Sequence, residues 1–535
     1  MNDGTQPPVI SEYECYNKLK AAKKPKSVIP GELPSRIVKE FTVELAKPLS
    51  TLLNKIVKSA EWPDQYKIEH VTPIAKVPLP QTEDDLRPIS LTPLFSKVME
   101  QFVVSWLLDF IGHKLDFRQY GGTKGNSVCH YLIELVNFIL LEQEAGSTAV
   151  LACLVDFSKA FNRQDHCVLV TKLAEMGVPG WLLKLVISFL MDRKMTVKYR
   201  NKESAMYLLP GGGPQGTLLG LFLFLVLIND LGFEGQTNST GEMITAKKRV
   251  KELNTIHLKY IDDLTFAESI DMKKQLVSVP NEERILPENF RSRHGQVLKS
   301  DTSKVQQQLQ VTKRYAADNL MKLNLEKTVV MLFNPCKKYD FEPTLKIDNK
   351  VLSVVESSKL LGVHLMSNLS WELNTKSIVQ KCHSRMWMLK RLKKLGASEN
   401  DLLDVYFKQI RSVAEYAAPV WHPSLTGLET AKIERIQKTA LHIILGSKYN
   451  SYSSALKTLD VSKLTDRRKQ LCLKFALKCE KSPKFSKWFK LNSRVTKTRK
   501  KASKYVDVFS NSARFDKSPI NYLTQLLNKK YACKK

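Results

Sequence analysis

The chain has 535 residues and is strongly basic, with 83 Lys and Arg against 53 Asp and Glu and a formal net charge of +30. Hydrophobic residues make up 43% of it, which excludes an intrinsically disordered chain and is enough for the cores of several domains. The charge excess favours a polyanionic partner, nucleic acid before an anionic membrane. The nine cysteines are scattered, without a C-x-x-C pair or zinc spacing, which indicates reduced cysteines in an intracellular protein.

The sequence carries no signal for export or membrane insertion. Its N-terminus lacks the basic start and the apolar stretch of a secretory signal. The longest apolar run, residues 218–228, is well short of the roughly 20 residues needed to cross a bilayer, and it predicts a buried helix. We therefore expect an intracellular protein that does not span a membrane.

The first half of the chain alternates between helical and extended patterns. Residues 1–60 have helical periodicity with Pro and Gly breaks, and residues 68–80 are β-rich. Apolar residues at three- and four-residue steps predict a helix over 94–111. The run 147–157 predicts a fully buried strand, and a helix at about 166–176 is expected to stop at Gly177.

Further signals follow in chain order. A second helix should begin near Pro179, and residues 195–209 predict a hairpin around "RNKE". Residues 268–300 resemble a polar insertion. An amphipathic helix is expected within 302–324, with its apolar face formed by Val305, Leu309, Thr312, Ala316 and Leu320.

The last third of the chain is predicted to be helical from about residue 376. The stretch 481–535 holds 16 Lys and Arg against 2 Asp and Glu. Its cluster "RVTKTRKKASK" at 494–504 is expected to be a mobile, solvated segment. Such a segment serves phosphate binding or nuclear targeting.

Three aspartates are predicted to lie at strand ends. Asp156 follows the buried strand, and Asp262 and Asp263 lie between two short strands in "LKYIDDLTFA". A solvated hairpin turn explains the adjacent pair by itself. If all three carboxylates meet, however, they repel strongly unless divalent cations such as Mg²⁺ lie among them. Two such ions activate an attacking hydroxyl and stabilise a leaving pyrophosphate. Spacing alone leaves both interpretations open.

Six blocks in order resemble the reverse transcriptase of non-LTR (LINE-type, jockey-like) retrotransposons. The blocks are "DDLRPISLTPLFSKVMEQF", "LVDFSKAFNRQDH", "GGGPQGTLLGLFLFLVLINDL", "KYIDD", "MKLNLEKTVVMLF" and "KLLGVHLMSNLSW". Together they span roughly residues 10–375. The helical segment 376–480 resembles the region that follows the polymerase in these elements.

The resemblance implies an α+β fold of the right-hand polymerase type. Fingers and a palm with an antiparallel sheet would be followed by a helical thumb-like region. The expected parts are an N-terminal extension and fingers at 1–150, a palm with fingers elements and a primer-grip-like hairpin at 151–375, the thumb-like region at 376–480 and a basic tail at 481–535.

The same resemblance implies a two-metal site. Asp156 matches the first metal ligand, and Asp262 and Asp263 match the Y-x-D-D motif. In the family these residues hold two Mg²⁺ ions, with Mn²⁺ as an alternative, that activate the primer 3′-hydroxyl and neutralise the incoming triphosphate.

Five further residues match positions that contact the dNTP in the family. Phe161 falls where an aromatic ring excludes a 2′-hydroxyl, although an ordinary core aromatic is the simpler explanation. Arg87 matches the fingers arginine that binds phosphates, and Lys76 is a second candidate beside the alternative of an exposed lysine. Gln215 and Gly216 match the loop that touches nucleotide and template, and would otherwise be a flexible connection.

Two matches remain. Lys327 matches a catalytic lysine proposed to protonate or neutralise the leaving pyrophosphate, against a simple helix-end lysine. Gly362 falls in the hairpin that resembles the primer grip, and a plain tight turn explains it almost as well.

The chain also departs from the family pattern at four positions. The family usually has aspartate at Asn162, commonly valine at Gly213, often proline at Leu221 and arginine at Thr123. None of these departures removes a metal ligand. They leave fidelity, processivity and net activity open.

These features lead to one principal hypothesis and two rivals. The expected enzyme is an RNA-directed DNA polymerase with an RNA template, a DNA primer or target and dNTPs as partners, acting in the nucleus. No nuclease region is recognised, so an endonuclease is expected from a missing part of a longer element protein or in trans. The rivals are an RNA-dependent RNA polymerase, which the aromatic Phe161 argues against, and a decayed or domesticated nucleic-acid-binding scaffold.

Overall fold

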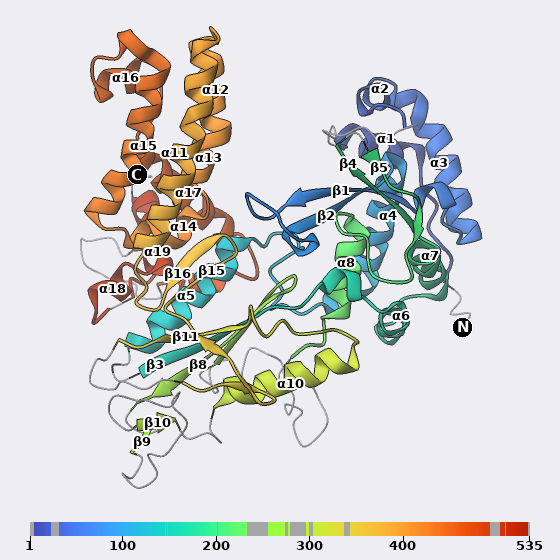
Figure 1. Ribbon diagram of the computed structural model, residues 1–535, viewed down its shortest axis with the longest axis horizontal. Coiled ribbons are helices and arrows are strands. Elements are labelled where there is room, and N and C mark those ends of the chain that lie inside the picture. The colour runs from blue at the N-terminus through green and yellow to red at the C-terminus, as the bar shows by residue number, and fades with distance from the viewer. Residues whose placement is uncertain are drawn as a thin grey trace. The chain divides into compact units, whose positions relative to one another are not determined.

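The computed structural model is a mixed α+β structure that divides into two compact units (Figure 1). It describes residues 5–22, 32–144, 146, 148–200, 202–232, 255–272, 276–278, 296–298, 303–335, 343–492, 503–508 and 510–532. The N-terminal unit comprises Met1–Gly122, Asp156–Gly235 and Gln310–Asn324. The C-terminal unit comprises Thr123–Val155, Gln236–Leu309 and Leu325–Lys535.

The N-terminal unit contains the helices predicted from apolar periodicity. They are α1 (Glu12–Ala21), α2 (Ser35–Glu40), α3 (Thr42–Ser59), α4 (Leu94–Ile111), α6 (His166–Glu175), α7 (Gly180–Leu190) and α8 (Leu218–Leu227). Gly177 has a φ of +82° just after α6, and Pro179 is the N-cap of α7, which confirms both predicted boundaries. The predicted buried helix at 218–228 is also confirmed, since most side chains of α8 are buried.

The sheet of the N-terminal unit is built on β1 (Ile68–Ala75). It pairs antiparallel with β2 (Leu86–Leu91) and parallel with β4 (Lys194–Tyr199), which turns back into β5 (Lys202–Glu203) and β6 (Tyr207–Leu208). The predicted hairpin is thereby confirmed. The parallel pairing ends at Val71, so Pro73 lies where β1 has only β2 beside it, opposite Pro88. Proline is tolerated there because no second ladder requires its missing N–H.

A buried ion pair links β1 to the residue that precedes β4. The Arg193 Nε donates to the Glu69 carboxylate at 2.8 Å, and the two side chains are only 2% and 3% exposed. Arg193 also donates to the carbonyl oxygen of Phe189 and lies over its ring. A buried charge is tolerated only while its partner is present.

The C-terminal unit contains a second five-stranded sheet. Its order is β14 (Ser353–Val354), β11 (Val329–Phe333), β3 (Thr148–Val155), β8 (Asp263–Asp271) and β7 (Thr255–Tyr260). All neighbours are antiparallel except β11 and β14. Every residue of β3 after Thr148 is buried, which confirms the predicted core strand.

Helix α5 (Val128–Glu144) packs against β3 and β7 of this sheet. The fully buried Tyr131 hydroxyl donates to the Thr265 Oγ1 at 2.5 Å, and burial raises the Tyr131 pKa above its usual range. This bond ties the helix to β8 two residues after Asp263.

The polar insertion begins later than predicted. Strand β8 continues to Asp271, and Glu268 is a buried residue of this strand. Its carboxylate accepts hydrogen bonds from the Ser303 hydroxyl and the Lys304 N–H, at the start of α10 (Lys304–Asp318). A carboxylate is favourable there because it faces the positive end of the helix. Beyond it, the chain forms only a short antiparallel pair in the part that is described, β9 (Leu276–Ser278) with β10 (Gln296–Leu298).

The apolar face predicted for the amphipathic helix is correct except at its last residue. Val305, Leu309, Thr312 and Ala316 are buried in α10. Leu320 is instead 59% exposed and has a φ of +54°, because the helix has already ended at Asp318.

Beyond the sheet, two small hairpins precede a helical region. The hairpins are β12 (Lys346–Ile347) with β13 (Lys350–Val351), and β15 (Ser357–Leu360) with β16 (Val363–Met366). The helices are α11 (Glu372–Lys394), α12 (Glu399–Val405), a π-helix (Tyr406–Arg411), α13 (Ser412–Ala414), α14 (Ala418–Trp421), α15 (Gly427–Leu445), α16 (Tyr452–Thr458), α17 (Leu464–Glu480), α18 (Ala513–Asp516) and α19 (Pro519–Ala532). The predicted change to helix near residue 376 is confirmed.

The C-terminal stretch, which the sequence analysis described as a basic tail, contains a helix. Helix α19 packs against α17 and α5 through buried residues such as Leu523 and Leu527. Most of the basic cluster expected to be mobile, residues 493–502, lies outside the described residues. The described helices include none that is long and apolar enough to span a membrane.

Replacing Glu69 by alanine should strongly destabilise the N-terminal unit. Arg193 would remain buried without its carboxylate, and losing one partner of a buried pair costs about 3–5 kcal/mol. Urea denaturation measures the free energy of unfolding. The matched control is Asp404→Ala, which breaks the exposed pair with Lys408 and should change stability little. Equal effects of the two substitutions would contradict a structural role for the buried pair.

Candidate nucleotide and metal site

The hairpin between β7 and β8 carries the adjacent aspartates at a two-residue turn. Tyr260 pairs with Asp263, so Ile261 and Asp262 are the two turn residues. Ile261 has a φ of +59°. Hairpin turns with a positive φ at this position normally use glycine, and a β-branched residue there stores roughly 1–3 kcal/mol of strain. Such strain clusters at functional sites.

The register of the C-terminal sheet relates this hairpin to the end of β3. Val155 pairs with Leu264 in the antiparallel ladder of β3 and β8. Asp156 is the residue after Val155, and Asp263 is the residue before Leu264. Because of this register, β3 ends at the edge of the sheet where the β7–β8 hairpin turns, and Asp156 is the next residue in the chain. The described residues include no group of three His, Cys, Asp or Glu arranged as metal ligands, so the ligand role of the aspartates stays a prediction.

Main-chain pairing within the N-terminal unit holds the segment that begins at Asp156. The Asn324 N–H donates to the Asp156 carbonyl oxygen at 2.8 Å, and the Ser158 N–H donates to that of Lys322 at 2.8 Å. Phe157 and Leu323 form the bridge between these two bonds. The segment after α10 thus fixes the backbone of the first predicted metal ligand.

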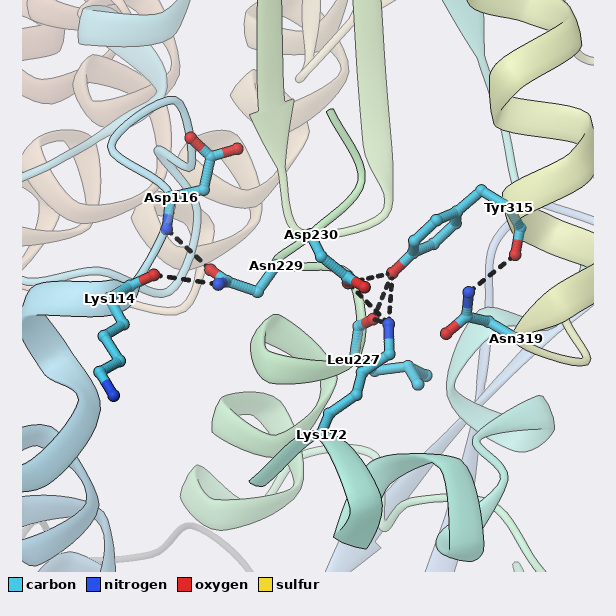
Figure 2. A network of polar contacts seen from close by, with 8 residues as sticks. All are labelled: Lys114, Asp116, Lys172, Leu227, Asn229, Asp230, Tyr315 and Asn319. Atoms are coloured by element: carbon cyan, nitrogen blue, oxygen red, sulfur yellow. Dashed lines mark hydrogen bonds and ion pairs between the residues drawn. The ribbon is translucent and has the colours of Figure 1, made fainter. Parts of the chain in front are cut away.

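A polar network anchors the second part of α10 within the N-terminal unit (Figure 2). The Lys172 ammonium of α6 donates to the Asp230 carboxylate at 2.6 Å, to the Leu227 carbonyl oxygen and to the Tyr315 hydroxyl. That hydroxyl lies 2.7 Å from the Asp230 carboxylate and 2.5 Å from the Leu227 oxygen. The network connects α6, the end of α8 and α10, and so supports the segment that pairs with Asp156.

Lys76 and Arg87 come together on one hairpin of the N-terminal unit. Ile74 of β1 pairs with Arg87 of β2, and the Lys76 N–H donates to the Asp85 carbonyl oxygen at 2.7 Å. Both side chains are exposed. Their location on an exposed hairpin is compatible with phosphate binding, which stays a prediction for both residues.

The loop carrying Gln215 and Gly216 is held at the other end of β2. The Ser90 N–H donates to the Gln215 carbonyl oxygen at 2.9 Å. Gly216 has a φ of +108°, and a Cβ there would lie 3.3 Å from the Ser90 carbonyl oxygen. Glycine is therefore required on conformational grounds. The loop is not a freely flexible connection.

Phe161 lies in a short 3₁₀ helix (Ala160–Arg163) next to the same loop. Its carbonyl oxygen accepts a hydrogen bond from the Gly213 N–H at 2.9 Å. The ring is half-buried and stacks on Phe224 of α8, with centroids 4.7 Å apart. This contact agrees with a packing role, and the residue is only partly buried. The steric-gate role stays a prediction.

Lys327 and Gly362 lie at turns of the C-terminal unit. Lys327 is exposed in a turn just before β11, so the alternative of a helix-end lysine is wrong. Gly362 has a φ of +85° and forms the β15–β16 turn with Leu361, whose φ is +49°. The Tyr416 hydroxyl donates to the Leu361 carbonyl oxygen at 2.8 Å. Gly362 is thus a tight-turn residue, and its primer-grip role stays a prediction.

The sequence analysis missed Glu100, which contacts the start of the helix that follows the Gln215 loop. This fully buried residue of α4 accepts hydrogen bonds from the Leu218 and Leu219 N–H groups at 2.9 and 3.0 Å, in the first turn of α8. Burial raises the pKa of its carboxyl to about 7, against the lowering effect of these N–H groups and of Arg193. Glu100 therefore anchors the helix that follows the Gln215 loop.

The sequence did contain a signal for this residue. Glu100 lies on the same helical face as Val103, Val104, Leu107 and Ile111, all of which are buried. A carboxylate on an apolar face indicates a buried polar contact.

The raised pKa of Glu100 predicts a pH-dependent stability. Between about pH 4.5 and pH 7 the folded protein keeps a proton on Glu100 that the unfolded chain releases. Glu100 therefore contributes its full stabilisation at a pH below the pKa that it has in the unfolded chain. This stabilisation is lost as the pH rises through the pKa that it has in the folded protein. We expect the unfolding free energy of the wild type, relative to Glu100→Gln, to fall by roughly 2–3 kcal/mol from about pH 5 to about pH 8. Urea denaturation of both proteins across this range measures the difference, and parallel curves would contradict the assignment.

Comparison with known proteins identifies the family. A family model described as "Reverse transcriptase (RNA-dependent DNA polymerase)" matches residues 76–365, more than half of the chain. The probable RNA-directed DNA polymerase from transposon BS of Drosophila melanogaster is 22% identical over 449 residues, covering 82% of this chain and 45% of the relative. The RNA-directed DNA polymerase from mobile element jockey of the same organism is 23% identical over 464 residues, covering 85% and 46%. This chain thus spans about half the length of these curated relatives.

Among solved structures, the chain is similar to telomerases of Candida tropicalis. The apo enzyme has a TM-score of 0.39 at 14% identity, covering 83% of this chain and 68% of that chain. The complex with the TWJ fragment of telomeric RNA has a TM-score of 0.37 at 13% identity, covering 92% and 66%. The family match extends from Lys76 to the hairpin that contains Gly362. Because this match covers more than half of the chain, the chain belongs to the reverse transcriptase family, with relatives among the jockey and BS non-LTR retrotransposons.

Proposed function

We propose that this chain is the RNA-directed DNA polymerase of a non-LTR retrotransposon. It adds dNTPs to a primer 3′-hydroxyl opposite an RNA template. The observation that carries the proposal is the register of β3, β8 and β7, which ends β3 beside the Asp262–Asp263 hairpin inside the family-matched span. Fingers, palm and thumb-like region would follow the right-hand arrangement, with the boundaries expected from the sequence.

Asp156, Asp262 and Asp263 would hold two Mg²⁺ ions, or Mn²⁺ in their place. The donor set fits, because carboxylate oxygens are the ligands that these hard cations prefer. When bound, the ions activate the primer hydroxyl and neutralise charge on the triphosphate. The positive φ of Ile261 turns the chain so that both hairpin aspartates lie at the tip of a rigid two-strand ladder. Rigid placement limits the reorganisation that catalysis requires.

The remaining residues would bind the nucleotide and the primer. Arg87 and Lys76, exposed on one hairpin, would contact the phosphates of the dNTP, and a guanidinium suits bidentate phosphate binding. Lys327 would protonate or neutralise the leaving pyrophosphate. Gly362 would let the β15–β16 turn approach the primer closely.

Two elements that meet within the N-terminal unit would form the sugar and base contacts. Phe161 would exclude a 2′-hydroxyl with its ring. Gln215 and Gly216 would touch the nucleotide and the template from the adjacent loop. The Phe161–Gly213 hydrogen bond supports this pairing of roles, because it holds the aromatic segment and the loop together.

The charge of the chain supports a nucleic-acid duplex as partner. A net charge of +30 favours binding through phosphates, so the affinity should fall steeply with salt. The family match supports RNA as the template and DNA as the primer or target. The endonuclease that nicks the target would come from another part of the element protein or in trans.

A catalytically decayed or domesticated scaffold remains the second candidate. One observation favours it: the departures from the family pattern at Asn162 and Gly213. It predicts binding of primer–template without extension.

Asp262→Ala should abolish primer extension on an RNA template in the presence of Mg²⁺. Its affinity for the primer–template in the absence of metal should stay similar or increase, because a repulsive charge is removed. Gel assays of extension and fluorescence anisotropy measure the two effects. The matched control is Asp404→Ala, an exposed aspartate of α12. Full extension by Asp262→Ala would contradict the catalytic assignment, and a wild type that binds without extending would favour the scaffold.

Phe161→Ala should raise incorporation of ribonucleotides relative to deoxyribonucleotides, because the ring that excludes the 2′-hydroxyl is lost. Phe161→Tyr keeps a ring of similar size and should keep the discrimination. Single-nucleotide extension with each sugar measures the ratio of kcat/KM. Unchanged discrimination by Phe161→Ala would assign the ring to packing on Phe224 alone.

A further inference from the structure

Gly213 occupies a position where space, not backbone conformation, requires glycine. Its φ lies outside the left-handed region, so other residues could adopt the backbone. A Cβ on Gly213, however, would lie 2.3 Å from the Gln164 Oε1 and 2.8 Å from its Cδ. Both distances are far below van der Waals contact.

The Gln164 side chain is buried, so moving it away from such a Cβ would displace the groups packed around it. The residue is 2% exposed. Its amide Oε1 and Nε2 are buried and make no hydrogen bond among the described residues. The amide therefore contributes its volume to this position instead of polar contacts.

Main-chain bonds dock the loop on the segment that carries Phe161 and Gln164. The Gly212 N–H donates to the Gln164 carbonyl oxygen at 3.1 Å, and the Gly213 N–H donates to that of Phe161 at 2.9 Å. The His166 Nε2 lies 2.9 Å from the Gly212 carbonyl oxygen. At Gly213, two residues before Gln215, the loop therefore lies directly against the segment that carries Phe161 and Gln164.

We propose that Gln164 is a positioning residue for the nucleotide site and acts as a pair with Gly213. The Gln164 side chain fills the space beneath the loop and so sets the separation between Phe161 and Gln215. This inference rests on the proposed function, since both residues are proposed there to contact the nucleotide. It also accounts for the departure at Gly213, where the family commonly has valine: Gln164 already occupies the room that a side chain would need.

A double-substitution cycle tests the pair. Gly213→Ala should raise the KM for dNTP at least about tenfold, with a smaller change in kcat, because the loop is pushed away from Phe161. The matched control is Gly211→Ala, since a Cβ on Gly211 would have only the Gln164 carbonyl oxygen nearby, at 4.0 Å. It should stay within about twofold of the wild type. Gln164→Ala should itself raise the KM for dNTP by about fivefold, because the side chain that sets the separation between Phe161 and Gln215 is lost, and an unchanged KM would overturn the positioning role. Gln164→Ala with Gly213→Ala should stay within about threefold of Gln164→Ala, because the added Cβ no longer meets the amide.

The melting temperature of the same variants gives a readout that does not depend on catalysis. Gly213→Ala should lower it, and the added Gln164→Ala should recover most of the loss. If Gly213→Ala does not fold, recovery of folding in the double variant supports the pair, and failure to recover overturns it. The pair is also overturned if Gly213→Ala behaves like Gly211→Ala, or if the two effects simply add. A wild type that extends no primer would overturn the proposed function, while the melting data would still decide whether Gln164 and Gly213 are coupled.

Discussion

The antiparallel register of β3, β8 and β7 is the constraint on which the candidate site depends. It pairs Val155 with Leu264 and Tyr260 with Asp263, and thereby fixes where β3 ends relative to the hairpin. A slip of one residue would move every side chain of a strand to the other face of the sheet. Because β3 is buried along nearly its whole length, such a slip would place its side chains against neighbours that they do not fit. Hydrophobic packing therefore fixes the strand end that leads into Asp156 and the strands that carry the hairpin aspartates.

Polar groups within the N-terminal unit hold the elements that surround the proposed nucleotide position. Ser90 binds the Gln215 backbone, Glu100 anchors the start of α8, and the segment of Phe161 accepts the Gly213 N–H. Each contact joins residues far apart in the sequence. Buried hydrogen bonds of this kind specify one loop position, since leaving any partner unpaired costs free energy. A loop rich in glycine is in this way held by its neighbours.

The sequence predicted local structure well and long-range contacts poorly. Periodicity located α4, α8 and the strands around the aspartates, because the pattern of buried residues repeats along each element. Periodicity placed Leu320 on a helix that ends at Asp318. It also began the polar insertion within β8, because the sequence does not reveal that the Glu268 carboxylate is buried and accepts a hydrogen bond at the start of α10. Glu100 and Gln164 were missed for a similar reason: their partners lie more than 45 positions away, at Leu218 and Gly213.

Binding of Mn²⁺ to the protein with primer–template and dNTP, followed by electron paramagnetic resonance, tests most directly whether the aspartates share bound cations. Asp156→Asn and Asp263→Asn should each weaken Mn²⁺ binding by at least about tenfold, as expected when a carboxylate ligand is lost. Asp165→Asn removes the same charge from the N-cap of α6 and should leave the affinity unchanged. Equal Mn²⁺ affinity in all four proteins would contradict a metal site formed by the strand end and the hairpin.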